Sequence, residues 1–226
     1  MAPLNDNLEE NKRRKEVIMK NLFLVSSFEE VSTELQSFDR DLVGKKVTFI
    51  PTASNVEEVT FYVESGQEAL EEMGLIVDHL DVSTAKPEEI QKKLRENDCI
   101  YVTGGNTFFL LQELKKSGAD QVIIEEIQKG KIYIGESAGA IVLSKTVEYV
   151  KTMDDPEKAP SLNSFSGLNV VDFYPLPHYK DIPFSEVTMD IEKQYKEQLN
   201  FCFINNHEGI IVEGNHTRIV KKIIEK

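Results

Sequence analysis

The 226-residue chain lacks tryptophan and has only two cysteines and four histidines. Cys99 and Cys202 each lie inside an apolar run, so we expect both to be buried and reduced, and no disulfide framework is implied. The cysteines and histidines do not cluster at the spacing of a zinc site. The sequence therefore predicts chemistry that needs neither a metal nor an organic cofactor.

The sequence also lacks a long hydrophobic run and an excess of positive charge. No apolar stretch approaches the length of a membrane span, and no signal peptide is apparent. Lysine and arginine number 26 against 39 aspartates and glutamates, which gives a formal net charge of -13. Because such a surface repels phosphate backbones and anionic lipids, we expect no nucleic-acid or membrane partner. The expected protein is cytoplasmic and is a monomer or a homodimer.

The first 18 residues differ from the rest of the chain. They are polar and charged and show no periodic pattern of a strand or a helix, so residues 1–18 are expected to be a disordered or non-native extension. We hypothesise that Met19, which precedes the first apolar run, is the natural start. Residues 19–226 contain no repeat and no clear linker, and they are expected to form one domain.

From residue 22 onward, short apolar runs alternate with longer segments of helical period. Strands are expected at 22–26, 46–51, 75–80, 98–103 and 131–135, and helices at 28–38, 56–73, 86–96 and 107–129, the last interrupted at residues 117–118. This order predicts an α/β fold with a mostly parallel, doubly wound sheet flanked by helices on both faces. After a polar loop near residues 154–160, we expect a helix at 182–199 and strands at 201–204, 209–212 and 217–220. The last two would form a C-terminal β-hairpin.

The strongest local signal lies after the fifth expected strand, where Gly135-Glu136-Ser137-Ala138-Gly139 leads into a helical segment. This is the strand–turn–helix pattern of a nucleophile elbow, although a plain junction of small residues would look the same. A serine at so tight a turn is crowded by the strand and the helix, so the residues two before and two after it must be very small. The hydroxyl of Ser137 would project toward the next helix, where the N–H of Ala138 could bind an oxyanion.

A second glycine-rich turn, Gly104-Gly105-Asn106, follows the fourth expected strand. Adjacent parallel strands would bring this turn beside the elbow, so the N–H of Gly105 could be the second oxyanion donor. A phosphate-binding turn, or a helix start capped by Asn106, would account for the same residues. The full dinucleotide-binding fingerprint is absent, which argues against a nucleotide cofactor.

A serine nucleophile needs a base, and the choice among the four histidines stays partly open. His79 lies inside an expected strand and His216 in an expected hairpin turn. His178 follows a rigid Pro-Leu-Pro segment, and His207 lies at the end of another expected strand, so both are candidates. Glu208 could orient the imidazole of His178 and complete a triad of serine, histidine and glutamate.

The segments 104–108 and 135–140, together with their separation, resemble the peptidase E family of serine peptidases. That family includes alpha-aspartyl dipeptidase and, more distantly, cyanophycinase. The resemblance extends over nearly the whole chain from Met19 and implies a fold similar to that of class I glutamine amidotransferases. It implies the following roles: Ser137 as nucleophile, His178 as base, Glu208 as third member, and Gly105 and Ala138 as oxyanion donors.

The resemblance also bears on substrate binding. It places Asp154 where the family has an aspartate near the substrate's amino end, and we take Asp154, Asn106 and Glu136 as candidate substrate-binding residues. Aspartyl dipeptidases have tryptophan where this chain has Glu136, which could repel an acidic substrate or lie in a solvated loop. They also use an arginine between base and acid, whereas this chain has only lysines between Tyr179 and His207, at positions 180, 193 and 196.

The expected activity is that of a serine peptidase that hydrolyses short peptides, including N-terminal aspartyl dipeptides, through an acyl-enzyme. A carboxylesterase or another amide hydrolase would use the same triad. A non-catalytic binding protein on the same fold is a third interpretation, which labelling by a fluorophosphonate probe would reject. A glutamine amidotransferase would need cysteine in place of Ser137.

Overall fold

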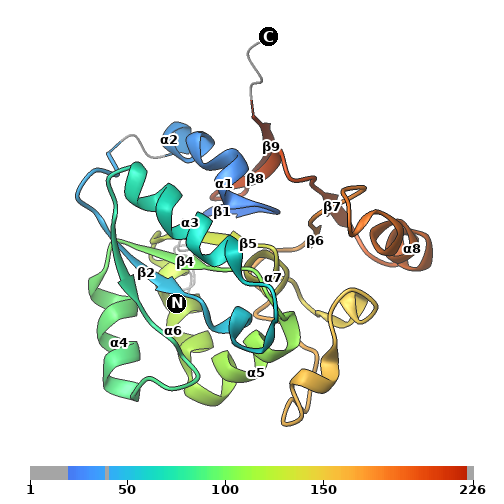
Figure 1. Ribbon diagram of the computed structural model, residues 1–226, viewed down its shortest axis with the longest axis horizontal. Helices are drawn as coiled ribbons and strands as arrows, with labels where there is room; N and C mark the ends of the chain where they lie inside the picture. Colours follow the sequence, from blue (N-terminus) through green and yellow to red (C-terminus); the bar gives the residue numbers. More distant parts are fainter. Residues whose placement is uncertain (1–19, 39–40, 223–226) are drawn as a thin grey trace, which may run out of the picture.

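The computed structural model describes residues 20–38 and 41–222, so the expectation for residues 1–18 lies outside the described part. A seven-stranded sheet with the order β3-β2-β4-β5-β1-β8-β9 forms its centre (Figure 1). The strands are β1 (Asn21–Val25), β2 (Lys46–Ile50), β3 (Ile76–His79), β4 (Cys99–Val102), β5 (Ile132–Glu136), β8 (Glu208–Glu213) and β9 (His216–Lys221). β1 to β5 are parallel, whereas β8 is antiparallel to β1 and pairs with β9 as a hairpin. The α/β fold expected from the sequence is confirmed.

Helices cover both faces of the sheet (Figure 1). One face packs against α1 (Phe28–Val31), α2 (Leu35–Phe38) and α3 (Phe61–Glu72), and the other against α4 (Pro87–Glu96), α5 (Thr107–Ser117), α6 (Ala119–Gln128) and α7 (Ala138–Ile141). Alternate residues of each central strand enter different cores: Phe23 lies in the core beneath α1 to α3, and Leu22 and Leu24 lie in the core beneath α4 to α7. The continuous apolar strands of the sequence therefore follow from burial on both faces.

Several helices are shorter than their sequence pattern because turns interrupt them. The segment 28–38 contains a 3-10 turn, Ser32–Glu34, between α1 and α2. A second 3-10 turn, η3 (Thr52–Val56), precedes α3, which starts at Phe61. The long pattern at 107–129 divides at Gly118, whose φ of 75° ends α5 in a left-handed conformation that suits glycine.

The chain between α7 and β8 adds a smaller unit beside the sheet. β6 (Tyr174–Leu176) and β7 (Phe201–Phe203) form a two-stranded parallel ribbon, and α8 (Ser185–Tyr195) connects them. Figure 1 shows this ribbon and α8 at the right of the molecule. The sequence pattern predicts α8 and β7, whereas β6, which lies in a proline-containing segment, is not predicted.

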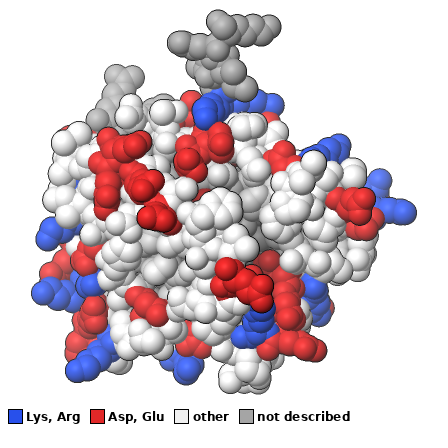
Figure 2. Space-filling view, viewed as in Figure 1, with Lys and Arg blue, Asp and Glu red and all other residues white. Residues whose placement is uncertain are grey.

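The surface is acidic in places. Figure 2 shows acidic side chains gathered over α3, whose exposed residues include Glu64, Glu68 and Glu71. Among the described residues, no helix is both long enough and apolar enough to cross a membrane. Cys99 is buried as expected, whereas Cys202 is only half-buried.

Candidate active site

Ser137 lies at a strained turn between β5 and α7. Its φ of 46° and ψ of -104° fall in a region that residues with a side chain rarely adopt. The N–H of Ser137 donates to the carbonyl of Val25 at 2.8 Å, and the carbonyl of Ser137 accepts from the N–H groups of Ala140 and Ile141. The strand and the helix thus fix the serine backbone from both sides.

The two glycines that flank Ser137 are required by steric contact. A Cβ atom at Gly135 would lie 2.6 Å from the carbonyl oxygen of Gly139, and a Cβ atom at Gly139 would collide with the carbonyl oxygen of Val102. The hydroxyl of Tyr133 donates to the carbonyl of Gly139 at 2.7 Å and holds the first turn of α7 against β5. The steric reason that the sequence suggested for the elbow is therefore present in the structure.

His178 is the histidine that faces the serine. Its Nε2 lies 3.0 Å from Oγ of Ser137, and both side chains are partly exposed. His207 instead is exposed and lies 3.4 Å from the Glu30 carboxylate. Of the two histidines that the sequence left open as the base, His178 is therefore the one within hydrogen-bond distance of Ser137.

His178 is itself held in an uncommon backbone conformation, with a φ of 57°. Its N–H donates to Oγ of Ser26 at 3.0 Å, and that hydroxyl donates to the carbonyl of Ile204. Its ring stacks on Phe184 with ring centres 4.8 Å apart. These contacts restrict the imidazole to the orientation that faces Ser137.

The residue on the other ring nitrogen is Asn206 and not Glu208. Nδ1 of His178 lies 2.8 Å from Oδ1 of Asn206, and because an amide oxygen can only accept, Nδ1 carries the proton. This tautomer leaves Nε2 as the acceptor for the serine hydroxyl.

The predicted contact between Glu208 and His178 is wrong. One carboxylate oxygen of Glu208 accepts from the N–H of Asn205 at 3.1 Å, and the other lies 2.7 Å from the Lys221 ammonium on β9. Glu208 is the first residue of β8, and in the β8–β9 hairpin it lies opposite Lys221. The signal that sequence reasoning missed is the pair of asparagines at 205–206, since the amide of asparagine can orient a histidine as a carboxylate does.

The electrostatic surroundings of His178 favour a neutral imidazole in the resting protein. Burial lowers the pKa of His178, while the hydrogen bond to Asn206 and the negative charge of Asp181 act in the opposite direction. A neutral imidazole is the form that can accept a proton from Ser137.

The Gly104–Gly105 turn lies directly beside Ser137. A Cβ atom at Gly104 would be 3.3 Å from Cβ of Ser137. Gly105 has a φ of 127° and packs so closely on Ala53 of η3 that a side chain there would collide with the Ala53 backbone. Among the hydrogen bonds between described residues, none uses the N–H of Gly105 or the N–H of Ala138. Gly105 is half-buried and Ala138 is buried, so beside the serine both N–H groups lack a partner from the described part of the chain.

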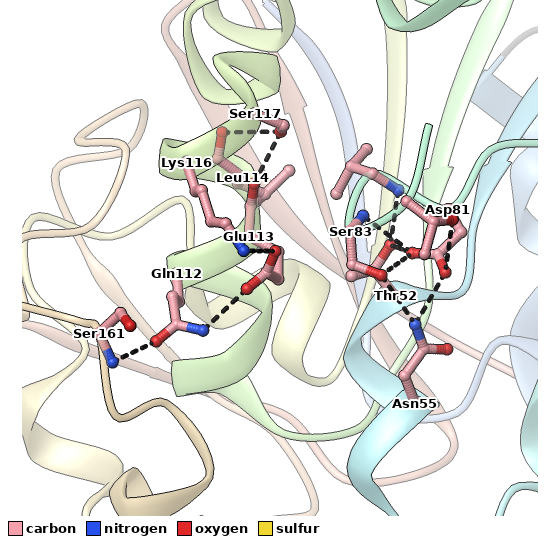
Figure 3. Close-up of polar contacts among 12 residues, drawn as sticks. Thr52, Asn55, Asp81, Ser83, Gln112, Glu113, Leu114, Lys116, Ser117 and Ser161 are labelled. Carbon is pink, nitrogen blue, oxygen red and sulfur yellow. Dashed lines mark hydrogen bonds and ion pairs between the residues drawn. The ribbon is translucent and has the colours of Figure 1, made fainter. Parts of the chain in front are cut away.

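The η3 turn that supports Gly105 is fixed by Asp81. The Asp81 carboxylate accepts from the Thr52 hydroxyl at 2.9 Å and from the Asn55 amide at 3.0 Å (Figure 3). Ala53 lies between these two residues, and its carbonyl accepts the N–H of Asn106 at 2.8 Å. Asp81 thus acts on the glycine turn through η3.

Glu136 is buried, so the expectation of a solvated loop carboxylate is wrong. Its side chain is buried, with the carboxylate 2.9 Å from the N–H of Phe28 and 2.8 Å from the hydroxyl of Tyr101. Burial raises the pKa of Glu136, although the N–H groups of Phe28 and Gly104 and the hydroxyl of Tyr101 act to lower it. Since residues of a strand alternate in direction, Glu136 points into the core beneath α1 and α3, where it joins β1–α1 to β4.

Asn106 has the structural role that was the alternative to substrate binding. Its Oδ1 accepts from the N–H groups of Phe108 and Phe109, which caps α5. Its amide nitrogen donates to the carbonyl of Asp155 at 3.0 Å, and the side chain is buried.

Asp154 lies at the start of α5, next to the glycine turn. One of its carboxylate oxygens accepts from the N–H of Thr107 at 3.0 Å. Burial raises the pKa of Asp154 to about 6, and the nearby Glu57 carboxylate contributes in the same direction. Tyr62 belongs to the same region, because its ring would lie 3.6 Å from a Cβ at Gly104, and its buried hydroxyl has no hydrogen-bond partner among the described residues.

Comparison with known proteins shows the family to which the chain belongs. The family model described as peptidase family S51 matches residues 22–220. The chain belongs to peptidase family S51. As a member of this family it is a serine-type peptidase, and the resemblance to peptidase E noted from its motifs is confirmed.

Three relatives illustrate the range of similarity within family S51. An uncharacterized peptidase of Listeria monocytogenes is 55% identical over 205 residues, which cover 91% of this chain and all of the relative. Peptidase E of Haemophilus influenzae is 31% identical over 169 residues, 71% of this chain and 74% of the relative. A crystal structure of a Listeria monocytogenes protein described as a candidate peptidase E has 54% identity and a TM-score of 0.88, and covers 91% of this chain and 100% of that one.

Proposed function

We propose that this S51 peptidase hydrolyses short peptides through an acyl-enzyme on Ser137, with His178 as the base and Asn206 as the residue that orients it. The observation that carries the proposal is the 3.0 Å contact between Oγ of Ser137 and Nε2 of His178 at a strained elbow. Membership in the family supports peptides as the substrate class.

The first half of the reaction forms the acyl-enzyme. Nε2 of His178 takes the hydroxyl proton as Oγ of Ser137 bonds to the scissile carbonyl carbon. The carbonyl oxygen gains negative charge, which the N–H groups of Gly105 and Ala138 would stabilise. The imidazolium then gives its proton to the leaving amine as the carbon–nitrogen bond breaks.

The second half releases the acid. A water molecule gives a proton to Nε2 of His178 and attacks the acyl carbon, and the same N–H groups hold the second oxyanion. Collapse of this intermediate returns the proton to Ser137. Asn206 keeps the imidazole in one tautomer through both halves.

We propose that Asp154 binds the free amino group of the peptide. The support is its carboxylate beside the glycine turn, whose pKa is raised mainly by burial; the two nearby charges, Glu57 and Lys158, are of opposite sign and pair with each other at 3.4 Å. The unpartnered hydroxyl of Tyr62 offers a further polar contact beside the glycine turn. A substrate with a charged amino terminus would therefore be preferred over the same peptide with an acetylated terminus.

N-terminal aspartyl dipeptides are one candidate substrate class, and their recognition depends on a cation. The chain has no arginine between Tyr179 and His207, so a bidentate grip of the aspartyl carboxylate from that segment is excluded. Glu136 is buried and accepts from the N–H of Phe28 and the hydroxyl of Tyr101, so we expect its carboxylate not to contact the substrate directly. We expect aspartyl dipeptides to be cleaved without the strong preference that an arginine gives.

The test is a dipeptide panel with aspartyl, isoaspartyl and neutral amino-terminal residues, each free and acetylated, together with matched esters. Ser137→Ala should abolish turnover and fluorophosphonate labelling while leaving thermal unfolding unchanged. Cleavage of esters alone would identify a carboxylesterase. Wild-type rates of peptide cleavage in Ser137→Ala would contradict the proposal.

A further inference from the structure

The side chain on Nδ1 of His178 is the uncharged amide of Asn206. In a triad with a carboxylate, the acid stabilises the imidazolium that forms when histidine accepts the serine proton. Asn206 can orient the ring, but its amide carries no net charge. A negative charge that compensates the imidazolium must come from another group.

Asp181 is connected to both residues of this pair. Its carboxylate accepts from the backbone N–H of Asn206 at 2.6 Å, and its own N–H donates to the carbonyl of His178 at 3.0 Å. With the bond between Nδ1 and Oδ1, these contacts close a ring of three hydrogen bonds through His178, Asn206 and Asp181. The ring joins the loop after β6 to the loop after β7.

The other charged groups near His178 are engaged elsewhere. Each has a partner of its own on the elements packed around the ring: Glu208 with Lys221, Glu30 with His207 and Lys222, Glu192 with the Tyr179 hydroxyl, Lys180 over the Tyr179 ring, and Glu136 with Phe28 and Tyr101. Asp181 is the charged group whose field acts on the pKa of His178, and it acts to raise it.

We propose that Asp181 is a positioning residue that supplies, one hydrogen bond beyond Asn206, the negative charge which this array of serine, histidine and asparagine lacks. The inference rests on the proposed function. Asp181 fixes Asn206 through its backbone N–H, and Asn206 fixes the imidazole. Its charge favours the imidazolium form during proton transfer, and the amide between them keeps the proton on His178.

The variant that isolates the charge is Asp181→Asn. An amide oxygen can still accept the N–H of Asn206, so the geometry is kept while the charge is lost. We expect kcat to fall about tenfold with KM nearly unchanged, since the loss falls on the charged transition state. Asp181→Ala also removes the acceptor for the N–H of Asn206, so its kcat should fall further. The matched control is Asp190→Asn, an exposed position on α8, which should leave kcat and KM unchanged.

The decisive readout is the titration of the His178 ring, followed by NMR in the resting protein. Loss of a negative charge should lower the pKa of His178 in Asp181→Asn, and the acid limb of the profile of kcat/KM against pH should move to lower pH in parallel. An unchanged pKa of His178 overturns the proposal, whether or not the variant is less stable. Because the NMR titration needs no turnover, inactivity of the wild-type protein toward peptides would count against the proposed function alone.

Discussion

Ser137 and His178 lie 3.0 Å apart, yet two different parts of the molecule hold them. Ser137 lies at the end of β5 in the central sheet, where β5, α7 and two glycines restrict its backbone to one conformation. His178 belongs to the loop after β6, outside that sheet, and is held by hydrogen bonds to Ser26, Asn206 and, through Asn206, Asp181. The nucleophile is positioned by steric contact and the base by polar contacts.

This difference determines how strongly a substitution in each part should affect the site. A substitution at a closely packed backbone position has a large effect, because an added methyl group cannot be accommodated without moving a strand or a helix. Removing one contact from a hydrogen-bonded loop has a smaller effect, because each polar contact contributes roughly 0.5–1.5 kcal/mol. Variants on the sheet side should therefore have larger effects than variants on the loop side.

The largest effect is expected from Gly139→Ala on the sheet side. The new methyl group would collide with the carbonyl of Val102, so β4 or α7 must move. We expect labelling of Ser137 to fall by at least about 100-fold, with a lower melting temperature. Fluorophosphonate labelling rates and thermal unfolding measure both.

Gly118→Ala provides the control for backbone strain without collision. Its φ of 75° is also unfavourable for alanine, but nothing lies within 4 Å of the added Cβ. It should cost about 1 kcal/mol of stability and leave activity unchanged. Equal losses of labelling in both variants would show that steric contact at the elbow is not the cause.

A smaller effect is expected on the loop side, from Asn206→Ala. Without the amide oxygen the ring can adopt the wrong tautomer, so kcat should fall on the order of 10–100-fold. Glu208→Ala should change kcat by less than about threefold, because its carboxylate contacts Asn205 and Lys221. Steady-state kinetics of both variants compare Asn206 and Glu208 as the residue that orients His178. A larger loss of kcat in Glu208→Ala would favour the triad of serine, histidine and glutamate.

The smallest effect concerns substrate binding and depends on pH. Asp154 has a pKa of about 6, so its carboxylate is charged above that pH and neutral below it. An amino terminus stays protonated across this range, so KM for free dipeptides should decrease as the pH rises from 5 to 7. Asp154→Asn should make KM independent of pH over this range and about tenfold higher at pH 7. The same pH dependence in Asp154→Asn would contradict the assignment.

The sheet side was predictable from the sequence because its signals are local. Apolar runs with helices between them predicted β1 to β5, and the spacing of Gly135, Ser137 and Gly139 predicted the elbow. Gly105 was placed beside the elbow because β4 and β5 are neighbouring parallel strands.

The loop side was less predictable because its contacts join distant segments. Asn206 meets His178 across 28 residues, and the asparagine has no charge to mark it as a partner. Both the charge of Glu208 and the resemblance to peptidase E indicate it as the third member, whereas the hairpin pairs it with Lys221. Glu136 was misplaced for a related reason: a carboxylate is rarely fully buried, and only the hydroxyl of Tyr101 and the N–H groups near it explain why this one is.

The most direct test of the account is a crystal structure of the protein after reaction with a fluorophosphonate. We predict a phosphorus atom bonded to Oγ of Ser137, with its phosphoryl oxygen between the N–H groups of Gly105 and Ala138. Nδ1 of His178 should remain on Oδ1 of Asn206, as in the free protein. An adduct on another residue, or an imidazole turned toward Glu208, would contradict the account.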